Sequence, residues 1–486
     1  MRDKDLYAQI LGIVSPWHVR EVDLRLAQGE VEVRLERDTT VPLACPTCSA
    51  AVPGYDSRER RWRHLDTCQY RTILVADVPR VNCAEHGVHQ IQLPWSEPGS
   101  RFTALFEALV IDWLQEANLS AVGRLMGLSW AEVDGIVGRA VKRGLARRQP
   151  LQPGHLSVDE TSFAKRYEYV TVVRDGESGH VVHVADGRGL DSLDSFYATL
   201  SDSQKEQITS VSMDMWGPYI SSTLAHVPDA ERKIAFDKFH IAKHLGVAVD
   251  QVRCQEHREL RAVGRDDLKG TKHLWLRNPQ KMARPLWQSF RALRQSTLRT
   301  ARAWALRQAA MCAWDYQSRG WAARAWTAWL KWAQRCRLAP MVRAGQMIRR
   351  HLWGIINAIV LKVTNGPLEA INGRIQKLKR EACGYRNRER FRRMILFRLG
   401  GLHLYPDGVG RSGGGQLAYV THTKPRSAGF SRHLSPARLR RFLRSFFDLT
   451  TISPRASRRP WVVERTLRRK LTGRPGTPSS VSSRAR

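Results

Sequence analysis

Between residues 155 and 240 the sequence alternates short apolar segments with turn residues, and this stretch constrains the fold more than any other part of the chain. The segments HLSVDETSF, YEYVTVVRD and GHVVHVADGRG predict three successive strands, with turns at Asp175-Gly176 and at Gly187. The stretch LDSLDSFYATLSDSQKEQ predicts a helix, and ITSVSMDMW and RKIAFDKFH predict two further strands. The pattern therefore indicates an α/β domain built on one sheet.

This order of elements is that of a ribonuclease-H-like core, in which the first and fourth strands are neighbours. Asp159 lies in the first predicted strand, and Asp214 lies in the fourth, on the face opposite Val211 and Met213. We therefore expect these two carboxylates to lie side by side. A single Asp at a strand end is more often a cap or a surface residue, and that alternative stays open for each of them.

A third acid stands at the start of an otherwise basic helix. The stretch VTNGPLEAINGRIQKLKR, residues 363–380, places Leu368, Ile371, Ile375 and Leu378 on one stripe, which is typical of an amphipathic helix. Glu369 falls in the first turn of this helix and could join the two aspartates if the helix packs on the sheet. A carboxylate in a first turn also suits the helix dipole, so a simple capping role stays open.

Clustered carboxylates repel unless cations neutralise them, and Mg²⁺ is the hard cation that such ligands prefer. Two Mg²⁺ ions bridged by carboxylates can activate a water or a DNA 3′-hydroxyl for in-line displacement at phosphorus. The three acids therefore predict a phosphoryl-transfer site that uses Mg²⁺ or Mn²⁺.

The net charge indicates what the chain binds. The 486 residues contain 79 Lys and Arg against 45 Asp and Glu, a formal charge of +34. Nucleic acid is the expected polyanionic partner, with an anionic membrane surface as the weaker alternative. Neither an apolar run near 20 residues nor a secretion signal is apparent, so we expect a cytoplasmic protein.

Half of the eight cysteines fall between residues 45 and 83, which indicates a metal site in a reducing compartment. Cys45 and Cys48 form C-x2-C, Cys83 and His86 form C-x2-H, and each pair follows a segment of alternating polarity. This spacing predicts a zinc ribbon, because each two-residue spacer lets one turn present two ligands to one ion. Four unrelated reduced residues remain an alternative. As ligands, His89 could replace His86, and Cys68 with His64 is a less favoured pair.

The stretch NLSAVGRLMGLSWAEVDGIVGRAVKR predicts a helix-turn-helix, with a short helix from Ser120, a turn at Gly127 and a second helix from Ser129. Ser129 and Glu132 have the spacing of a capping box. In such a unit the second helix can enter the major groove of DNA. Two ordinary packed helices are the alternative interpretation.

Residues 250–350 predict a long helical insertion without strands. Nine of the 16 tryptophans lie between residues 275 and 353, and Asp315 is the one acidic residue between 271 and 350. Tryptophans at helical spacing are more often core than ligand platform, so we expect Trp314, Trp321, Trp329 and Trp332 to be buried. The unneutralised basic face predicts contact with the DNA backbone.

The chain thus divides into four predicted parts. They are residues 1–95 with the zinc ribbon, 100–150 with the helix-turn-helix, 151–405 with the catalytic core and its all-α insertion, and a basic, largely disordered tail at 406–486. Within the tail only SPARLRRFLRSFF, residues 435–447, has helical periodicity.

Four separated blocks, HLSVDETSF, SVSMDMWGPY, AFDKFHIAKH and TNGPLEAINGRIQKLKREACGYRNRERFRRMILFRLGGL, resemble the catalytic blocks of bacterial insertion-sequence transposases of the ISL-three family, within the larger DDE group. The resemblance extends from about residue 40 to 405 and includes the ribbon (CPTC, CAEHGV and PW) and the helix-turn-helix. It implies that Asp159, Asp214 and Glu369 are the metal-binding triad. Asp237 and His240, from FDKFH, match a further block and are expected to support the site or to position DNA. A His as the fourth zinc ligand departs from the commoner Cys of the family.

The resemblance implies a cut-and-paste DNA transposase that binds terminal inverted repeats, cleaves the ends of its element and joins them to target DNA. Synapsis of two ends predicts a homodimer or a larger assembly on double-stranded DNA. The residues expected to contact DNA are Ser129, Arg139, Lys142, Arg143, Arg374, Lys377 and Arg380. The alternatives are a noncatalytic DNA-binding regulator built from the same modules and, less favoured, a phosphodiesterase that acts on RNA.

Overall fold

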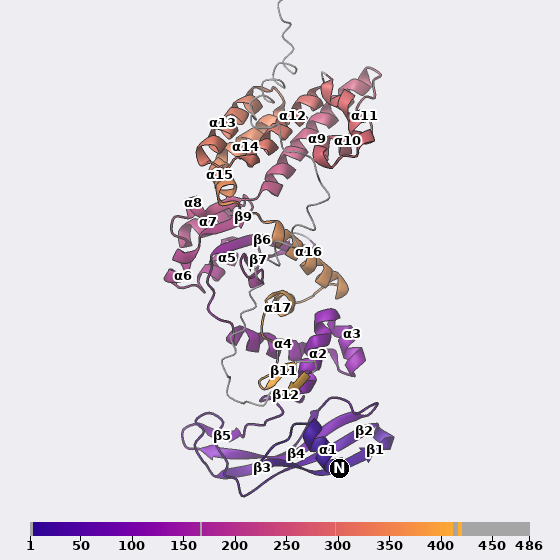
Figure 1. Ribbon diagram of the computed structural model, residues 1–486, viewed down its shortest axis with the longest axis vertical. Helices are drawn as coiled ribbons and strands as arrows, with labels where there is room; N and C mark the ends of the chain where they lie inside the picture. The colour runs from indigo at the N-terminus through magenta and orange to yellow at the C-terminus, as the bar shows by residue number, and fades with distance from the viewer. Residues whose placement is uncertain (1–2, 166–167, 297, 412–416, 420–486) are drawn as a thin grey trace, which may run out of the picture.

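The computed structural model describes residues 3–165, 168–296, 298–411 and 417–419. Figure 1 shows its parts in succession along the long axis: an N-terminal sheet at one end, a small group of helices, a central sheet, and a larger group of helices at the far end. Among the described residues, no helix combines the length and the apolarity that crossing a membrane requires.

The N-terminal part is a five-stranded sheet preceded by α1 (Asp3–Ile10). Its strands are β1 (Trp17–Arg25), β2 (Glu30–Arg37), β3 (Gly54–Arg63), β4 (Arg71–Cys83) and β5 (Gly87–Gln90), in the order β1-β2-β4-β3 with β5 paired to β4. Strands β1 and β2 pair as an antiparallel hairpin, and Gly29 turns it with a positive φ of 67°. Strand β3 was not expected, because its residues are almost all exposed and carry no apolar alternation.

The next part contains α2 (Ala104–Glu116), α3 (Leu119–Met126) and α4 (Trp130–Ala146). The predicted turn and second helix are confirmed: Gly127 ends α3 in the left-handed conformation, and Ser129 and Glu132 form a reciprocal capping box at α4. The three helices share one hydrophobic core with the central sheet and with two later helices. Packing, rather than a linker, therefore sets their position on the molecule.

The central sheet consists of β6 (His155–Ala164), β7 (Glu168–Asp175), β8 (Val181–Asp186), β9 (Ser210–Met213) and β10 (Ile234–Phe236), in the order β10-β9-β6-β7-β8. Strand β7 is antiparallel to β6 and β8, whereas β6, β9 and β10 are parallel. The prediction that the first and fourth strands are neighbours is confirmed. The helices within this part are α5 (Leu190–Tyr197), α6 (Asp202–Gln207), α7 (Gly217–His226) and α8 (Ala230–Lys233).

A helical region follows the sheet, and no strand is found among the described residues from 238 to 399. Its elements are α9 (Lys238–Ala262), α10 (Lys272–Leu276), α11 (Arg284–Gln295), α12 (Arg299–Cys312), α13 (Arg319–Arg335), α14 (Ala339–Arg350) and α15 (Leu352–Leu361), with short 3₁₀ turns at Pro279–Lys281 and Ala313–Asp315. The expectation that tryptophans form its core is confirmed for Trp329, and Trp314 and Trp332 pack against that core. It is wrong for Trp321, which is 51% exposed beside Arg324.

After the helical region the chain returns to the central sheet as α16 (Gly366–Glu381) and α17 (Arg388–Leu399), and α16 packs on β6. The predicted apolar stripe of α16 is buried. The described part of the tail forms a small sheet of β11 (Val409–Arg411) and β12 (Leu417–Tyr419), which contacts α2. The helical periodicity predicted for residues 435–447 lies outside the described residues.

Candidate functional site

Two of the predicted catalytic acids lie where neighbouring parallel strands stop pairing. The pairing of β6 with β9 ends at Ser157 opposite Ser212. Asp159 and Asp214 each follow the last paired residue by two positions, on strands that run in the same direction. The strand register therefore brings the two carboxylates to the same edge of the sheet, as the sequence predicted.

Asp159 is almost buried, with 8% of its surface exposed. Its Oδ1 accepts a hydrogen bond from the backbone N–H of Glu160 at 2.9 Å, and its Oδ2 accepts one from the Asn372 side-chain amide at 2.9 Å. The pKa of Asp159 is raised to about 7, chiefly by burial and in addition by the charges of Glu160, Asp214 and Glu369. The effect of Asp214 and Glu369 on this pKa places all three predicted acids in one electrostatic environment.

The start of α9 supplies the two residues that were expected to support the site. Asp237 caps α9 by accepting from the Phe239 backbone N–H at 3.1 Å. His240 follows one turn later, and its Nδ1 lies 3.4 Å from Asp214 Oδ2. Ligand atoms of Asp237, His240 and Glu369 lie within 4.8 Å of one another, which is close enough for one ion to contact all three. The structure thus brings both residues into the site.

Glu369 stands in the first turn of α16, as expected. Burial raises the pKa of its carboxyl and the charge of Asp237 raises it further, whereas His240 and Lys243 lower it. Among the described residues, no backbone N–H of α16 donates a hydrogen bond to this carboxylate. A capping hydrogen bond therefore does not account for its position.

The tightest group differs from the predicted triad. Within the described part of the chain, the ion-sized cluster contains Glu369 with Asp237 and His240, but not Asp159 or Asp214. Asp159 is instead held by Asn372, and Asp214 lies against His240. From the sequence, Asp237 and His240 were expected only to support the site. They lie at the start of α9, directly after β10, and residue spacing does not predict how far this point is from Glu369.

Sequence reasoning missed Glu160, Asn365 and Asn372. Burial raises the pKa of Glu160, and the charge of Asp214 raises it further. Glu160 Oε2 and Asn372 Oδ1 are buried without a hydrogen-bond partner. Acceptor oxygens thus outnumber donors here, and a ligand set dominated by oxygens fits a hard divalent cation. The DE pair at Asp159-Glu160 was the one available sequence signal.

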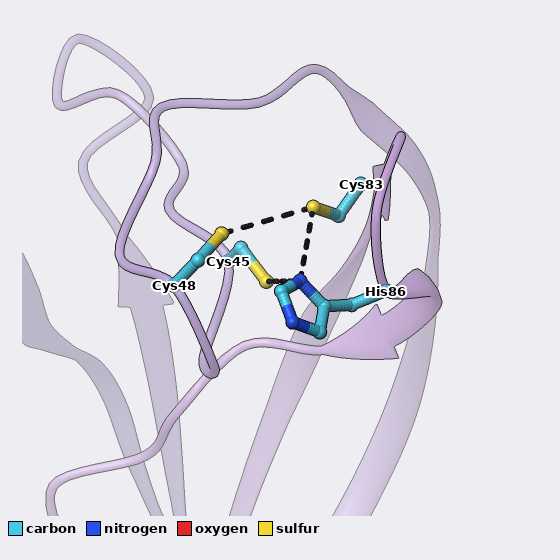
Figure 2. Close-up of side chains that lie close together, drawn as sticks. All are labelled: Cys45, Cys48, Cys83 and His86. Atoms are coloured by element: carbon cyan, nitrogen blue, oxygen red, sulfur yellow. Dashed lines mark hydrogen bonds between the residues drawn. The ribbon is translucent and has the colours of Figure 1, made fainter.

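The predicted zinc ligands converge at one end of the N-terminal sheet (Figure 2). Cys48 Sγ lies 3.8 Å from Cys83 Sγ, and His86 Nδ1 lies 3.5 Å from Cys83 Sγ and 3.9 Å from Cys45 Sγ. A tetrahedral zinc ion about 2.3 Å from each sulfur and about 2.0 Å from a nitrogen separates its ligands by about 3.5 to 3.8 Å. The four side chains therefore already have the spacing of a zinc site.

The surroundings of Cys45 and Cys83 favour their thiolate forms, whereas desolvation and the neighbouring Cys45 and Cys83 raise the pKa of the Cys48 thiol. Backbone N–H groups of Cys48 and Thr47 lower the pKa of the Cys45 thiol, and those of His86 and Glu85 lower the pKa of the Cys83 thiol. The alternative ligands lie elsewhere. The His89 ring contacts the backbone carbonyl of His86, and buried His64 is hydrogen-bonded to Thr103.

Three of the residues predicted to contact DNA have internal partners instead. The Ser129 hydroxyl donates to Glu132 Oε2 at 2.7 Å within the capping box. Arg139 Nε donates to buried Glu107 at 2.9 Å. Arg143, whose side chain is 8% exposed, pairs with Glu97 and donates to the Leu404 carbonyl.

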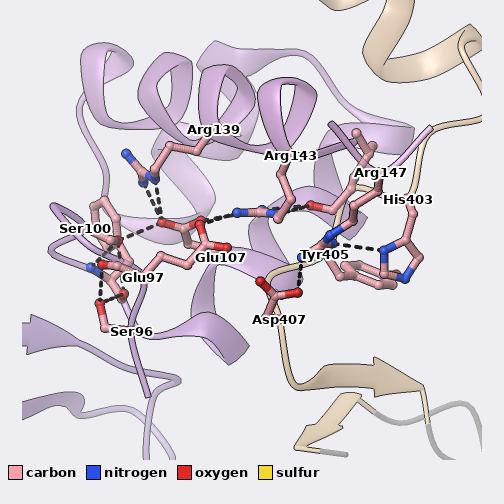
Figure 3. A network of polar contacts seen from close by, with 12 residues as sticks. Ser96, Glu97, Ser100, Glu107, Arg139, Arg143, Arg147, His403, Tyr405 and Asp407 are labelled. Atoms are coloured by element: carbon pink, nitrogen blue, oxygen red, sulfur yellow. Dashed lines mark hydrogen bonds and ion pairs between the residues drawn. The ribbon is translucent and has the colours of Figure 1, made fainter. Parts of the chain in front are cut away.

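Figure 3 shows these arginines in one network that joins α2, α4, the segment before α2 and the segment after α17. Glu107 also accepts from Ser100, and Arg147 donates to the Tyr405 carbonyl and pairs with Asp407. Buried arginines are stable only when their charge is paired and hydrogen-bonded. The network therefore stabilises the protein interior, which the sequence could not reveal because its acidic and carbonyl partners are distant in the chain.

The other predicted DNA-contacting residues face solvent. Lys142 of α4 is exposed and forms no ion pair within the described ranges. On α16, Arg374, Lys377 and Arg380 are exposed along one side of the helix, and Lys377 lies 3.6 Å from Glu381. Contact of these four residues with the phosphate backbone stays a prediction.

Comparison with known proteins agrees with these geometries in chain order. A zinc-finger model of the transposases of IS204, IS1001, IS1096 and IS1165 matches residues 42–86, and the helix-turn-helix model of transposase family ISL3 matches residues 91–141. A DDE family model described as "Transposase" matches residues 156–395. A zinc ribbon, a helix-turn-helix and an acid-bearing catalytic domain in this order define a DNA-binding transposase. The chain belongs to the ISL3 family of insertion-sequence transposases.

The curated relatives that this chain resembles are also transposases of insertion sequences. The chain is 26% identical over 434 residues to the transposase for insertion sequence element IS1557 of Mycobacterium tuberculosis, an alignment that covers 82% of this chain and 96% of the relative. It is 28% identical over 360 residues to the transposase for insertion sequence element IS1001 of Bordetella parapertussis, covering 73% and 88% respectively. The match to a zinc-finger model and the Cys-His cluster together support zinc as a cofactor.

Cys45→Ser is expected to abolish zinc binding, because one weak ligand in four breaks the tetrahedral set. Zinc content measured by inductively coupled plasma mass spectrometry should fall from about one ion per chain. Cys68→Ser is the matched control, since Cys68 is exposed and lies outside the cluster. Full zinc content in Cys45→Ser would show that these ligands are misassigned.

Arg143→Ala and Lys142→Ala should change different properties of the protein, although the two residues are adjacent in sequence. Removal of Arg143 leaves Glu97 and the Leu404 carbonyl without their partner and should lower the free energy of unfolding by on the order of 2–4 kcal/mol. Removal of exposed Lys142 should leave stability unchanged and weaken DNA binding. Urea denaturation and fluorescence anisotropy measure the two quantities, and an unaltered DNA affinity in Lys142→Ala would remove this residue from the interface.

Proposed function

We propose that this transposase cleaves the ends of an insertion sequence and joins them to target DNA at the carboxylate site of the central sheet. The observation that carries the proposal is the convergence of acids from two adjacent parallel strands with an acid of α16 packed on the same sheet. The order β10-β9-β6-β7-β8, with β7 antiparallel to its neighbours, supports a ribonuclease-H-like core.

In this proposal Asp159, Asp214 and Glu369 hold the divalent cation, Mg²⁺ or Mn²⁺. Asp237 and His240 complete the site, since their ligand atoms lie within reach of Glu369. Bound divalent cations would activate the attacking hydroxyl and neutralise charge on the phosphate. The chain's own residues hold and orient the ligands: Asn372 fixes Asp159, and His240 lies against Asp214.

The same proposal assigns the remaining predicted residues. Cys45, Cys48, Cys83 and His86 hold the structural zinc. Lys142 and the exposed row Arg374, Lys377 and Arg380 contact phosphates of the terminal inverted repeats or of target DNA. Arg139, Arg143 and Ser129 are left out of the DNA-contacting set because their polar groups have internal partners. Pairing of two ends requires a dimer or a larger assembly.

A noncatalytic regulator built from the same DNA-binding modules is less consistent with the central sheet. Such a protein has no use for a nearly buried Asp159 whose pKa is raised to about 7, a condition that costs stability at neutral pH. An RNA phosphodiesterase would use the same acids, so the substrate in the following experiment separates the two activities.

Asp159→Asn, Asp214→Asn and Glu369→Gln should each abolish cleavage and strand transfer while DNA binding is retained. The substitutions keep the shape of the side chains and remove the anionic ligand. Purified protein with Mg²⁺ and DNA carrying the element's ends is assayed for 3′-end cleavage and for joining, with an RNA of the same sequence in parallel. Wild-type activity in all three variants would overturn the site assignment.

Cation binding at this site should weaken as the pH falls below about 7. The raised pKa of Asp159 means that its carboxyl binds a proton more tightly in the folded protein than in water, and a cation must displace that proton. Apparent Mn²⁺ affinity should therefore fall about tenfold for each pH unit below 7 and level off above pH 8. Isothermal titration of the zinc-loaded protein measures this, with Asp159→Asn, which should bind Mn²⁺ weakly at every pH, as the control.

A further inference from the structure

Strands β6 and β9 diverge at the catalytic edge of the sheet, and one side chain fills the space between them. Their pairing ends at Ser157 and Ser212, so the backbone carbonyl of Val158 has no partner in β9. The amide of Asn365, which is 0% exposed, occupies this position. Its Nδ2 donates to the Val158 carbonyl at 3.2 Å, and its Oδ1 accepts from the Ser212 hydroxyl at 3.1 Å.

The position of Asn365 in its own helix makes this use of the side chain unusual. Asn365 is the N-cap of α16, and Asn is favoured there because its side chain can accept from the second or third N–H of the helix. In this structure the Asn365 side chain makes no capping bond. Its amide instead faces the two strands, so its hydrogen bonds link separate elements rather than stabilise α16 locally.

Each contact of Asn365 lies next to one of the acids. Val158 precedes Asp159, and Ser212 lies two residues before Asp214. The backbone N–H of Asn365 donates to Asp237 Oδ1 at 3.2 Å. Its carbonyl accepts from the Glu369 N–H at 3.0 Å, which forms the first turn of α16. One residue thus contacts all the chain segments that carry the proposed ligands.

We propose that Asn365 is a positioning residue that sets the register of α16 against β6 and β9 and thereby the spacing of the carboxylates. The orientation of its amide is determined chemically, because the Val158 carbonyl only accepts and the Ser212 hydroxyl can donate. This inference rests on the proposed metal-dependent function of the site. Mg²⁺ requires near-ideal octahedral geometry, so its binding is sensitive to a shift of α16 against β6 and β9.

Asn365→Ala should weaken metal binding by about 10- to 100-fold, the usual loss when a residue that orients ligands is removed. The Mg²⁺ concentration for half-maximal cleavage should rise by a similar factor, and Mn²⁺ should restore more of the activity than Mg²⁺. DNA binding without metal should be unchanged. Mn²⁺ affinity of the zinc-loaded, DNA-free protein, measured by electron paramagnetic resonance, gives a readout that does not depend on activity.

Asn365→Asp tests the same inference without a change in side-chain shape. The substitution keeps an oxygen near Ser212 but places a second oxygen, in place of the Nδ2 donor, against the Val158 carbonyl. The register should be disturbed at this single contact, so Mn²⁺ affinity should fall as it does in Asn365→Ala.

Asn357→Ala is the matched control for loss of a buried amide. Asn357 of α15 is 1% exposed, and its Nδ2 donates to the carbonyls of Glu231 and Ile234 at 2.7 and 2.8 Å. Its removal should lower thermal stability about as much as Asn365→Ala does, with Mn²⁺ affinity unchanged.

Three outcomes separate the possibilities. Weaker Mn²⁺ binding in both Asn365 variants, but not in Asn357→Ala, supports the positioning role. Wild-type Mn²⁺ affinity and Mg²⁺ requirement in the Asn365 variants, with only a lower melting temperature, overturn it. If wild-type protein binds Mn²⁺ with the affinity of Asp159→Asn, the proposed metal site itself fails, and the positioning role fails with it.

Discussion

Mutual repulsion of carboxylates is the constraint on which the catalytic half of this protein depends. Asp159, Asp214, Asp237 and Glu369 meet at one edge of the sheet, and Glu160 adds a fifth acid beside them. Local propensity would not gather these charges, so tertiary contacts must hold them. Backbone pairing of β6 with β9 places two of the acids, and hydrogen bonds from α16 to both strands place Glu369. Electrostatic repulsion is therefore concentrated at the edge where the proposed chemistry needs a cation.

The DNA-binding helices are not an independent module attached to this core. Helices α2, α3 and α4 share one hydrophobic core with β7, β8, α16 and α17. The Asn118 side chain donates to the carbonyl of Glu381 at the end of α16, and Arg398 of α17 donates to carbonyls at the end of α2. Because α16 carries Glu369 at its start, the same helix connects the proposed catalytic site with the helix-turn-helix. Packing thus sets the distance between DNA recognition and DNA cleavage.

Hydrophobic periodicity made the order of elements in the central sheet predictable, and from that order the neighbouring first and fourth strands. The spacing of Ser129 and Glu132 predicted the capping box. Strand β3 was missed because an exposed edge strand carries no buried face and hence no alternation. The tryptophan-rich helices were correctly expected to form a core, but Trp321 faces solvent. Periodicity assigns residues to a face of a helix, and only packing decides whether that face is covered.

The sequence by itself determined which residues could bind metal or take part in catalysis: the C-x2-C and C-x2-H pairs at zinc-ligand spacing and the acids at the ends of predicted elements. The tertiary structure decided which of them act together. It brought His86 rather than His89 to the cysteines, brought Asp237 and His240 next to Glu369, and paired Arg139 and Arg143 with internal acids. The physical reason is the separation, along the chain, of the residues that decide each property. Ligand spacing within a turn is a local property of the chain, whereas the partner of a charge or an amide lies on another segment. The acids that pair with Arg139 and Arg143 are 32 and 46 residues away, and the partners of the Asn365 amide are 153 and 207 residues away.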